Sequence, residues 1–254
     1  MKIASWNVNS VRVRQEHVID WLRSETPDVL GLQELKLPTE DFPHDAYAEA
    51  GYQALVNGQK TYNGVALLAK TQGTDVVTDI PDFDDPQRRV IAATYGDTRI
   101  VNLYCPNGQA VGSEKYEYKL SWFDALYNWL EQEAKQHEKL AVFGDFNIAP
   151  EDRDVHDPES WAGKILCSEP ERDALNRLMS LGLSDSFRLF DQPDESFSWW
   201  DYRMGGFRRN RGLRIDLILT SQALSDSAES AGIDKEPRAL ERPSDHAPVW
   251  LVTK

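Results

Sequence analysis

The sequence is poor in cysteine and contains no long apolar run. Two cysteines, Cys105 and Cys167, are too few for a disulfide-based scaffold. Apolar runs such as residues 65–69 fall well short of the roughly 20 residues that cross a bilayer. Met1 leads directly into a strand-like pattern without the apolar segment of a signal peptide. We therefore expect a cytoplasmic protein that does not associate with membranes.

The chain also lacks a Gly- or Ser-rich linker, a low-complexity tract and a fixed-period repeat. Strand-like and helix-like patterns alternate along its 254 residues without a clear break. This organisation predicts one α/β domain spanning residues 1–254, with residues 148–168 as an ordered surface loop and Gly182 capping a helix. The predicted strands are 2–8, 29–33, 64–69, 99–104, 139–143, 213–219 and 247–252, and the predicted helices are 15–24, 114–136 and 171–181.

Basic residues are outnumbered, with 28 Lys and Arg against 42 Asp and Glu and a net charge of −14. That balance argues against a nucleic-acid partner, but net charge does not describe how charge is distributed. Residues 202–215 contain five arginines and no acidic residue, and they follow the aromatic stretch 197–202. A charge run on its own is usually a solvated loop; the adjoining aromatics favour a surface that binds a nucleic-acid backbone.

Acidic and amide side chains recur where apolar runs end. The ends of strands are fixed by the core yet reach solvent, so polar groups placed there can converge on one point. Carboxylate, amide and imidazole groups arranged in this way provide a pocket for a hard divalent cation with a base beside it. The pattern predicts a metal-dependent hydrolase of phosphate esters. The side chains concerned are Asn7, Glu34, Asp145, Asn147, Asp216, Asp245 and His246.

The segment Gly144-Asp145-Phe146-Asn147 carries the strongest local signal. Alternate residues at a strand end can face the same cleft, so Asp145 could accept a proton from water while Asn147 donates to a phosphoryl oxygen. An ordinary Asx turn is the alternative interpretation. Asp216 stands between apolar residues and needs a partner if buried; His246 and Arg214 are both candidates.

Three further segments complete the candidate site. Glu34 and Asn7 would give Mg²⁺ an incomplete oxygen shell, which water and substrate phosphate would fill. Tyr104 precedes a Pro-Asn-Gly turn that would present its hydroxyl outward, although a single tyrosine is more often part of a core. Residues 60–64 could hold a backbone phosphate through amides, Lys60 and hydroxyl groups.

In this order, the segments closely resemble the exonuclease III family of abasic-site (AP) endonucleases, within the endonuclease/exonuclease/phosphatase superfamily. The resemblance covers nearly the whole chain, and FSWWDYR followed by GLRID favours its DNA-repair branch over the lipid and inositol phosphatases. The segments are WNVNS at 6–10, LQELK at 32–36, QKTYNGVAL at 59–67, YCPNG at 104–108, GDFNIAP at 144–150, FSWWDYR at 197–203, GLRIDLIL at 212–219 and SDHAPV at 244–249.

The resemblance implies a DNase I-like fold: a four-layer α/β sandwich of two packed mixed sheets flanked by helices. It implies a Mg²⁺-dependent enzyme, with Mn²⁺ as a substitute, that acts as a monomer on double-stranded DNA containing abasic sites or blocked 3′ ends. Cleavage would fall 5′ to the abasic site, accompanied by 3′-phosphodiesterase and 3′→5′ exonuclease activities.

The resemblance also implies roles for individual residues. Asp145 would activate water, Asn147 would fix the scissile phosphate, and Asp216 would support His246 against that phosphate. Tyr104 would contact the phosphate or the departing oxygen. The implied metal ligands are Asn7, Glu34, Asp145, Asn147, Asp245 and His246, and the implied DNA contacts are Lys60, Tyr62, Asn63, Trp199, Arg203, Arg208, Arg209, Leu213 and Ile215, of which Trp199, Leu213 and Ile215 would surround an extruded sugar.

The sequence departs from the family pattern at a few positions. Asn9 replaces an Asp that reaches metal in some relatives, which puts a second metal in doubt. Cys105, Asn107 and residues 113–116 favour endonuclease over processive exonuclease activity. Two alternatives remain: a phosphatase or phospholipase of the same superfamily, which would leave the arginine-rich stretch without a purpose, and a catalytically silent DNA-binding module, which would not need the acidic and amide groups.

Overall fold

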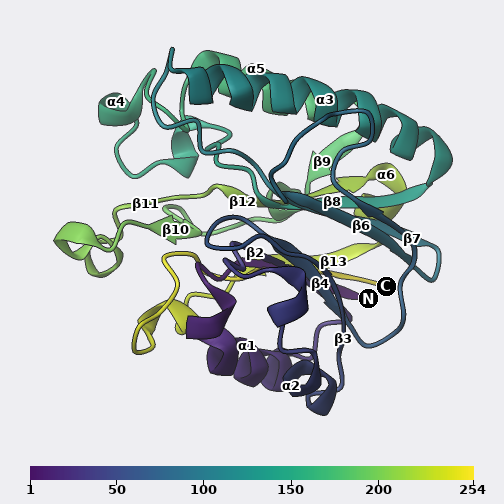
Figure 1. Cartoon of the computed structure of the whole chain (residues 1–254). Helices are drawn as coiled ribbons and strands as arrows, with labels where there is room; N and C mark the ends of the chain where they lie inside the picture. The colour runs from purple at the N-terminus through teal and green to yellow at the C-terminus, as the bar shows by residue number, and fades with distance from the viewer.

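Two six-stranded sheets pack face to face, and helices cover their outer faces (Figure 1). The computed structural model describes all residues, 1–254. The first sheet has the order β13 (Ala228–Ile233), β14 (Val249–Thr253), β1 (Lys2–Asn7), β2 (Val29–Gln33), β4 (Val65–Ala69) and β3 (Gln53–Asn57). The second has the order β5 (Thr74–Thr78), β6 (Val90–Tyr95), β7 (Thr98–Tyr104), β8 (Lys139–Asp145), β12 (Asp216–Ser221) and β9 (Leu183–Asp185).

The longer helices form the two outer layers, as the purple and teal ribbons in Figure 1 show. Helices α1 (Val11–Glu25) and α2 (His44–Glu49) lie on the first sheet; α3 (Glu114–Gln136) and α5 (Glu169–Met179) lie on the second. Short helices α4 (Pro158–Trp161) and α6 (Gln222–Ser227) and a two-stranded ribbon, β10 (Trp199–Trp200) and β11 (Gly212–Leu213), complete the fold. Both sheets contain parallel and antiparallel pairs. The predicted four-layer sandwich is confirmed. None of the helices is both long and apolar enough to cross a membrane.

Alternation along the central strands explains the layering. On β8, Leu140 and Val142 pack against the helices of the second sheet, whereas Ala141 and Phe143 pack between the two sheets. Successive side chains of a strand point to opposite faces, so a strand with an apolar side chain at every position must be covered on both faces. Strands such as β4 (VALLA) therefore require the four-layer arrangement.

Several boundaries differ from those predicted. The strand predicted at 213–219 is confirmed from Asp216, where β12 begins, but its start is wrong. Leu213 belongs to β11, and the Ile215 amide donates to the Ser198 hydroxyl instead of a neighbouring strand. The helix predicted at 171–181 is Glu169–Met179, and Gly182, at φ +88°, lies in the turn beyond its C-cap Ser180. The predicted loop 148–168 contains α4. Strands β3, β5, β6, β9 and β13 and helices α2 and α6 were not predicted.

The strand register brings the polar strand ends to one edge. β1 and β2 run parallel, with Asn7 opposite Gln33, and β7 and β8 run parallel, with Tyr104 opposite Asp145. β12 runs antiparallel to β8, so its first residue, Asp216, faces Asp145. The carboxyl ends of four strands and the start of a fifth therefore meet where the sheets pack together.

Candidate active site and metal centre

A buried chain of charged groups crosses the centre of this edge. The carboxylate Oδ2 of Asp216 lies 2.8 Å from His246 Nδ1 and accepts a hydrogen bond from the Ser198 hydroxyl at 2.7 Å. The other ring nitrogen, His246 Nε2, lies 3.7 Å from Asp145 Oδ2. His246, Asp145 and Asp216 are all buried. Asp216 therefore fixes the orientation of the ring, and Nε2 faces the centre of the site.

Of the two partners considered for Asp216, His246 is the one present in the structure. Arg214 instead forms a buried ion pair with Asp154, at 2.7 Å, and another with Asp185, at 2.7 Å. These two carboxylates raise the pKa of the arginine despite the opposing effect of burial. Arg214 thus belongs to the structural support beside the site.

Glu34 reaches the same centre from the first sheet. The amide of Asn7 bridges the two sheets, since its Nδ2 donates to Glu34 Oε1 and to Asp145 Oδ2, both at 2.9 Å. Lys36 forms an ion pair with Glu34 at 2.9 Å. Ligand atoms of Glu34, Asp145 and His246 all lie within 4.8 Å of one another. One metal centre, as predicted from the sequence, requires that these side chains lie close together. The distances fit that prediction.

Asn147 follows β8 in a left-handed conformation, at φ +51°. Its backbone amide donates to Asp145 Oδ1 at 2.9 Å. This bond forms the Asx turn that was the alternative interpretation of the segment. Its side chain is also held: Nδ2 donates to the Cys105 carbonyl at 3.0 Å, and Oδ1 accepts from Asn107 Nδ2 at 3.1 Å. The turn and a polar side chain fixed beside Asp145 therefore coexist.

Neighbouring charges and burial shift the pKa values of the side chains in the site. Burial raises the pKa of Asp145 to about 7, although His246 opposes the shift. Burial alone would lower the pKa of His246, but Asp216 and Asp145 raise it to about 10. Burial, with the nearby carboxylates of Glu34 and Asp145, keeps the pKa of Tyr104 well above its usual value. Near neutral pH the site therefore holds an imidazolium, a phenol and a carboxyl group poised to titrate.

Asp245 lies at the same edge but outside the three-residue cluster. Its oxygens accept hydrogen bonds from Asn9 Nδ2 at 2.9 Å and from the Trp199 indole at 3.0 Å. Burial opposes ionisation, but His246 and these donors together lower the pKa of Asp245. Asp245 is thus an ionised group that ties the first sheet to the β10–β11 ribbon.

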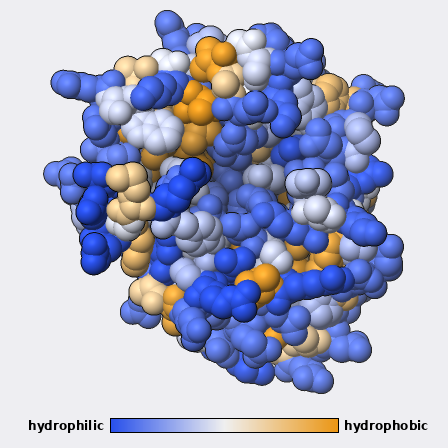
Figure 2. Space-filling model, turned by 60° about the vertical axis from the view of Figure 1, so that its left-hand side comes forward, coloured by the Kyte–Doolittle hydropathy of each residue, from blue (hydrophilic) through white to orange (hydrophobic).

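The residues predicted to contact DNA differ in exposure. Lys60 and Tyr62 are exposed, whereas Asn63 is buried and donates to Gln59 and Gln87. Tyr62 and Asn63 line a hollow of 660 Å³ that also reaches Tyr104 and Asn107. The face in Figure 2 is hollowed near its centre, and hydrophilic residues line the hollow.

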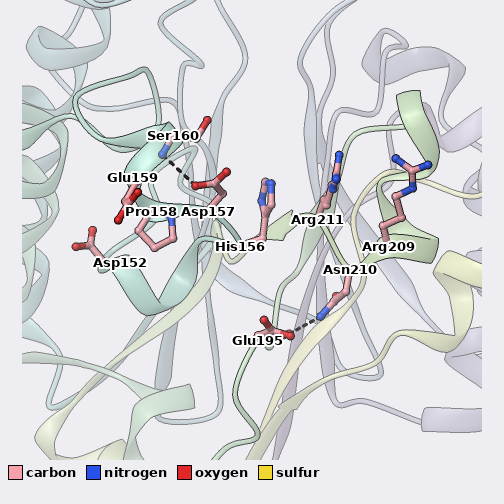
Figure 3. A pocket seen from close by; sticks show the side chains of 10 residues that line it. All are labelled: Asp152, His156, Asp157, Pro158, Glu159, Ser160, Glu195, Arg209, Asn210 and Arg211. Carbon is pink, nitrogen blue, oxygen red and sulfur yellow. Dashed lines mark hydrogen bonds between the residues drawn. The ribbon is translucent and has the colours of Figure 1, made fainter.

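The arginine-rich stretch forms a projecting loop beyond β10. Arg208, Arg209 and Arg211 are exposed and form no salt bridge, whereas Arg203 pairs with its neighbour Asp201 at 3.2 Å. Arg209 and Arg211 line a pocket of 940 Å³ opposite the α4 segment (Figure 3). Because that pocket also contains four carboxylates, those of Asp152, Asp157, Glu159 and Glu195, its charge is mixed.

The residues assigned to an extruded sugar are mostly covered. Leu213 and Ile215 are 0% and 2% exposed and pack in a small cluster with Leu166 and Val155, whereas Trp199 is only partly buried against it. Trp199 also lines a hollow of 340 Å³ with Trp161 and Met204. Trp199 is therefore the one residue of the three that presents surface to a ligand.

Sequence reasoning missed several residues that support the site. Arg89 is buried and stacks over the Tyr104 ring at 4.9 Å, and Ser198 holds Asp216. Arg14 donates to the carbonyls of Asn9 and Pro243. No sequence motif predicts these contacts. In the sequence, these residues are only arginines or a small polar residue near the recognised segments.

The fold and the site define a phosphoesterase class, and comparison with known proteins places the chain within it. The chain belongs to the endonuclease/exonuclease/phosphatase family, whose profile matches residues 4–246. It is 38% identical to exodeoxyribonuclease III of Haemophilus influenzae, with 100% of each chain covered. Its membership in the exodeoxyribonuclease III group of DNA-repair nucleases follows from this full-length match.

Solved structures agree. The 3′ phosphatase NExo from Neisseria, bound to a product DNA hairpin, is 47% identical, with a TM-score of 0.98 and coverage of 100% of this chain and 99% of that one. An AP endonuclease from Archaeoglobus fulgidus is 34% identical, with a TM-score of 0.96 and the same coverage. The chain is thus a nuclease of the DNA-repair type.

Proposed function

We propose that this protein is a Mg²⁺-dependent DNA-repair phosphodiesterase that cleaves 5′ to abasic sites and removes blocking groups from 3′ ends. The observation that carries the proposal is the meeting of Glu34, Asp145 and His246 ligand atoms within 4.8 Å at the end of the interface between the sheets. A carboxylate, a titratable carboxyl group and an imidazolium at one point match the needs of phosphodiester hydrolysis.

The donor set suits a hard cation. Glu34 and Asp145 offer carboxylate oxygens, and the NH₂ group of Asn7 donates to both; carboxylate oxygens suit Mg²⁺, and Mn²⁺ can replace it. We assign Glu34 as the principal ligand, with Asp145 beside it and Asp245 and Asn147 further out; Asn7 holds the two carboxylates through its NH₂ group. When bound, the ion would neutralise charge on the scissile phosphate.

We assign His246 to the phosphate instead of the metal. A pKa of about 10 favours the imidazolium, which has no lone pair for a cation but can donate from Nε2 to a phosphoryl oxygen. Tyr104 stays a phenol and donates alongside it, and Asn147 donates through the free hydrogen of its amide. The imidazolium, the phenol and the amide stabilise the charge of the transition state.

Asp145 orients and deprotonates the attacking water. A base must be deprotonated at the working pH. Burial raises the pKa of Asp145 to about 7 in the metal-free protein, and a cation bound beside it would lower that pKa and favour the carboxylate. The hydrogen bonds from Asn7 and from the Asn147 amide fix the direction of its two oxygens. The proton leaves the water toward Asp145 and the water oxygen bonds to phosphorus. The bond between phosphorus and the 3′ oxygen of the preceding nucleotide breaks, and that oxygen takes a proton from solvent and leaves as a 3′-hydroxyl group.

Double-stranded DNA is the proposed substrate, and exposed cations in two segments of the chain support it. Lys60 lies in the segment between β3 and β4, and Arg203, Arg208 and Arg209 lie in the loop between β10 and β11. Positive side chains that contact phosphates supply most of the sequence-independent affinity for DNA. We further propose that the protein acts as a cytoplasmic monomer.

In a second candidate function, the main activity is the processing of 3′ ends. The relative at 47% identity is described as a 3′ phosphatase, and here Leu213 and Ile215 are covered by Leu166 and its neighbours. A slot for an extruded sugar would therefore require these side chains to move. A terminal 3′ phosphate would need no such slot.

One assay separates the two candidates. The protein is incubated with three duplexes, carrying an internal abasic analogue, a 3′-phosphate at a nick, or an undamaged recessed 3′ end, each with Mg²⁺ or with EDTA. We expect Mg²⁺-dependent cleavage of the first two. Removal of the 3′-phosphate without incision at the abasic analogue would favour the second candidate, and no product from any duplex would refute the proposed function.

A further inference from the structure

A lysine lies fully buried behind the site, in the second turn of α3. Lys119 is 0% exposed and forms an ion pair with Glu171 of α5. Its ammonium group also donates to the carbonyl of Asn147 at 2.7 Å and to the carbonyl of Asn107 at 3.2 Å. An ammonium group has three N–H donors, so all three are used.

The partner carboxylate is equally well satisfied. Glu171 Oε1 accepts a second hydrogen bond from the Leu166 amide at 3.1 Å. Its Oε2 accepts from the Ser168 amide and hydroxyl in the capping box at the start of α5. Glu171 therefore holds Lys119 in place while being fixed by its own helix.

Lys119 acts on the conformation of Asn147 in two ways. It binds the carbonyl of Asn147 directly, at a residue whose positive φ of +51° costs free energy unless neighbours fix it. It also binds the carbonyl of Asn107, the residue whose side-chain amide holds Asn147 Oδ1. One ammonium group thus anchors both loops that hold the Asn147 side chain.

Stability alone gives a weak reason for this arrangement. Burying an ion pair costs desolvation free energy that often equals the attraction between the charges, and apolar replacements are often equally stable. Burial indeed lowers the pKa of Lys119, against the opposing effect of Glu171. The same helix takes part in a second buried pair, Arg99–Glu133, in which the N–O distance is 2.6 Å and neither residue bonds to the site.

We propose that Lys119, held by Glu171, is a positioning residue that aims the Asn147 amide at the scissile phosphate. The proposal rests on the proposed function, because it assigns Asn147 a contact with that phosphate. Loss of the pair should lower kcat and leave KM nearly unchanged, since a misplaced group that acts in the transition state affects kcat. We expect a loss of roughly 10- to 100-fold, as misplacement by about 1 Å can cost about 100-fold.

The test compares two double variants. Lys119→Met with Glu171→Gln removes the pair without leaving a buried charge and keeps one acceptor oxygen for the Ser168 cap. Arg99→Met with Glu133→Gln is the matched control, because it removes a buried pair from the same helix away from the site. We expect both to lose some stability in urea and only the first to lose kcat; equal losses of kcat would overturn the proposal.

The coupling to Asn147 is tested by repeating the first double variant in an Asn147→Ala background. Residues that act as a unit are non-additive, so we expect less than about a twofold further loss of kcat there. If the double variant loses as much kcat in this background as it does in the protein that keeps Asn147, the proposal is overturned. Asn107→Ala, at an exposed position, removes the bond to Asn147 Oδ1 together with the bond from the Gln109 amide to Asn107 Oδ1. It tests the positioning of the Asn147 side chain if the core variant does not fold.

A structural readout keeps this test separate from the proposed function. In ¹H–¹⁵N spectra, the side-chain amide signals of Asn147 and Asn107 should shift in the first double variant and stay in place in the Arg99 and Glu133 control. Unmoved amide signals would overturn the positioning role even in an active enzyme. Inactivity of the wild-type protein on every duplex would refute the proposed function and leave the spectra to decide the positioning role.

Discussion

Replacing Asp216 by asparagine removes one negative charge from the centre of the site and keeps the shape of the side chain. Asp216 Oδ2 lies 2.8 Å from His246 Nδ1, and with Asp145 it overcomes burial and raises the pKa of His246 from 6.5 to about 10. That difference corresponds to a preference of about 5 kcal/mol for the imidazolium, at ~1.36 kcal/mol per pKa unit. His246 is only 4% exposed, so solvent screens the interaction little.

The loss of charge has a defined effect on rate. In the variant, the pKa of His246 should fall toward its ordinary value of 6.5. At pH 8 only about 3% of the molecules would then carry the imidazolium, so kcat should drop roughly 30-fold from protonation alone. The loss should shrink as the pH falls below 6.5, and the wild-type rate should persist to higher pH.

The same shift sets a stability dependence with a definite sign. A histidine with a raised folded pKa stabilises the protein fully below its unfolded pKa, and the contribution disappears as the pH rises through the folded value. For the metal-free wild type, this window runs from 6.5 to about 10. The Asp216→Asn variant should lack most of that dependence in urea unfolding.

NMR titration of the imidazole signals provides the direct assay. The chain has five histidines, and a His246→Gln spectrum assigns the signal of interest. Asp185→Asn is the control, because it removes a carboxylate from the Arg214 ion pair and should leave the midpoint of His246 unchanged. Equal midpoints in the wild type and in Asp216→Asn would refute the electrostatic account.

Three further predictions concern the metal, the DNA and the fold. Glu34→Gln should raise the Mg²⁺ concentration for half-maximal rate at least about tenfold, since carboxylate charge sets affinity for hard cations; an unchanged Mg²⁺ titration would remove Glu34 as a ligand. Replacing Arg208 and Arg209 by alanine should flatten the plot of log affinity against log salt by about 1.8, at ~0.9 per phosphate contact, and an unaltered slope would place that loop away from DNA. Gly144→Ala should destabilise the protein by more than about 3 kcal/mol, because the added Cβ would lie 1.8 Å from the Leu103 carbonyl oxygen; near-native urea unfolding would contradict that steric argument.

The sequence predicts the centre of the site because its groups stand at the ends of strands. Asn7, Glu34 and Asp145 each follow an apolar run, and the register of the sheets then brings them together. Their types also restrict the chemistry, since carboxylates and amides favour a hard cation. Asp216 is informative for a similar reason: an acid inside an apolar run needs a partner, and His246 supplies it.

Residues that depend on distant packing could not be predicted. Lys119 lies in an amphipathic helix, where a lysine is normally solvent-exposed, and only the fold places it against Glu171, 52 residues away. Arg214 likewise resembles the other arginines of its loop in sequence, but it lies inside the protein between Asp154 and Asp185. Local sequence does not determine which cation of a cluster is buried.

The central claim is that Glu34, Asp145 and His246 surround one divalent ion and one phosphate, and anomalous diffraction from crystals containing Mn²⁺ and a duplex with an abasic analogue tests it most directly. The account predicts an ion about 2.0–2.2 Å from a Glu34 oxygen, as expected for a hard cation of this size, and a phosphoryl oxygen hydrogen-bonded to His246 Nε2. An ion bound elsewhere, or coordinated by His246 with no phosphate beside it, would contradict the account.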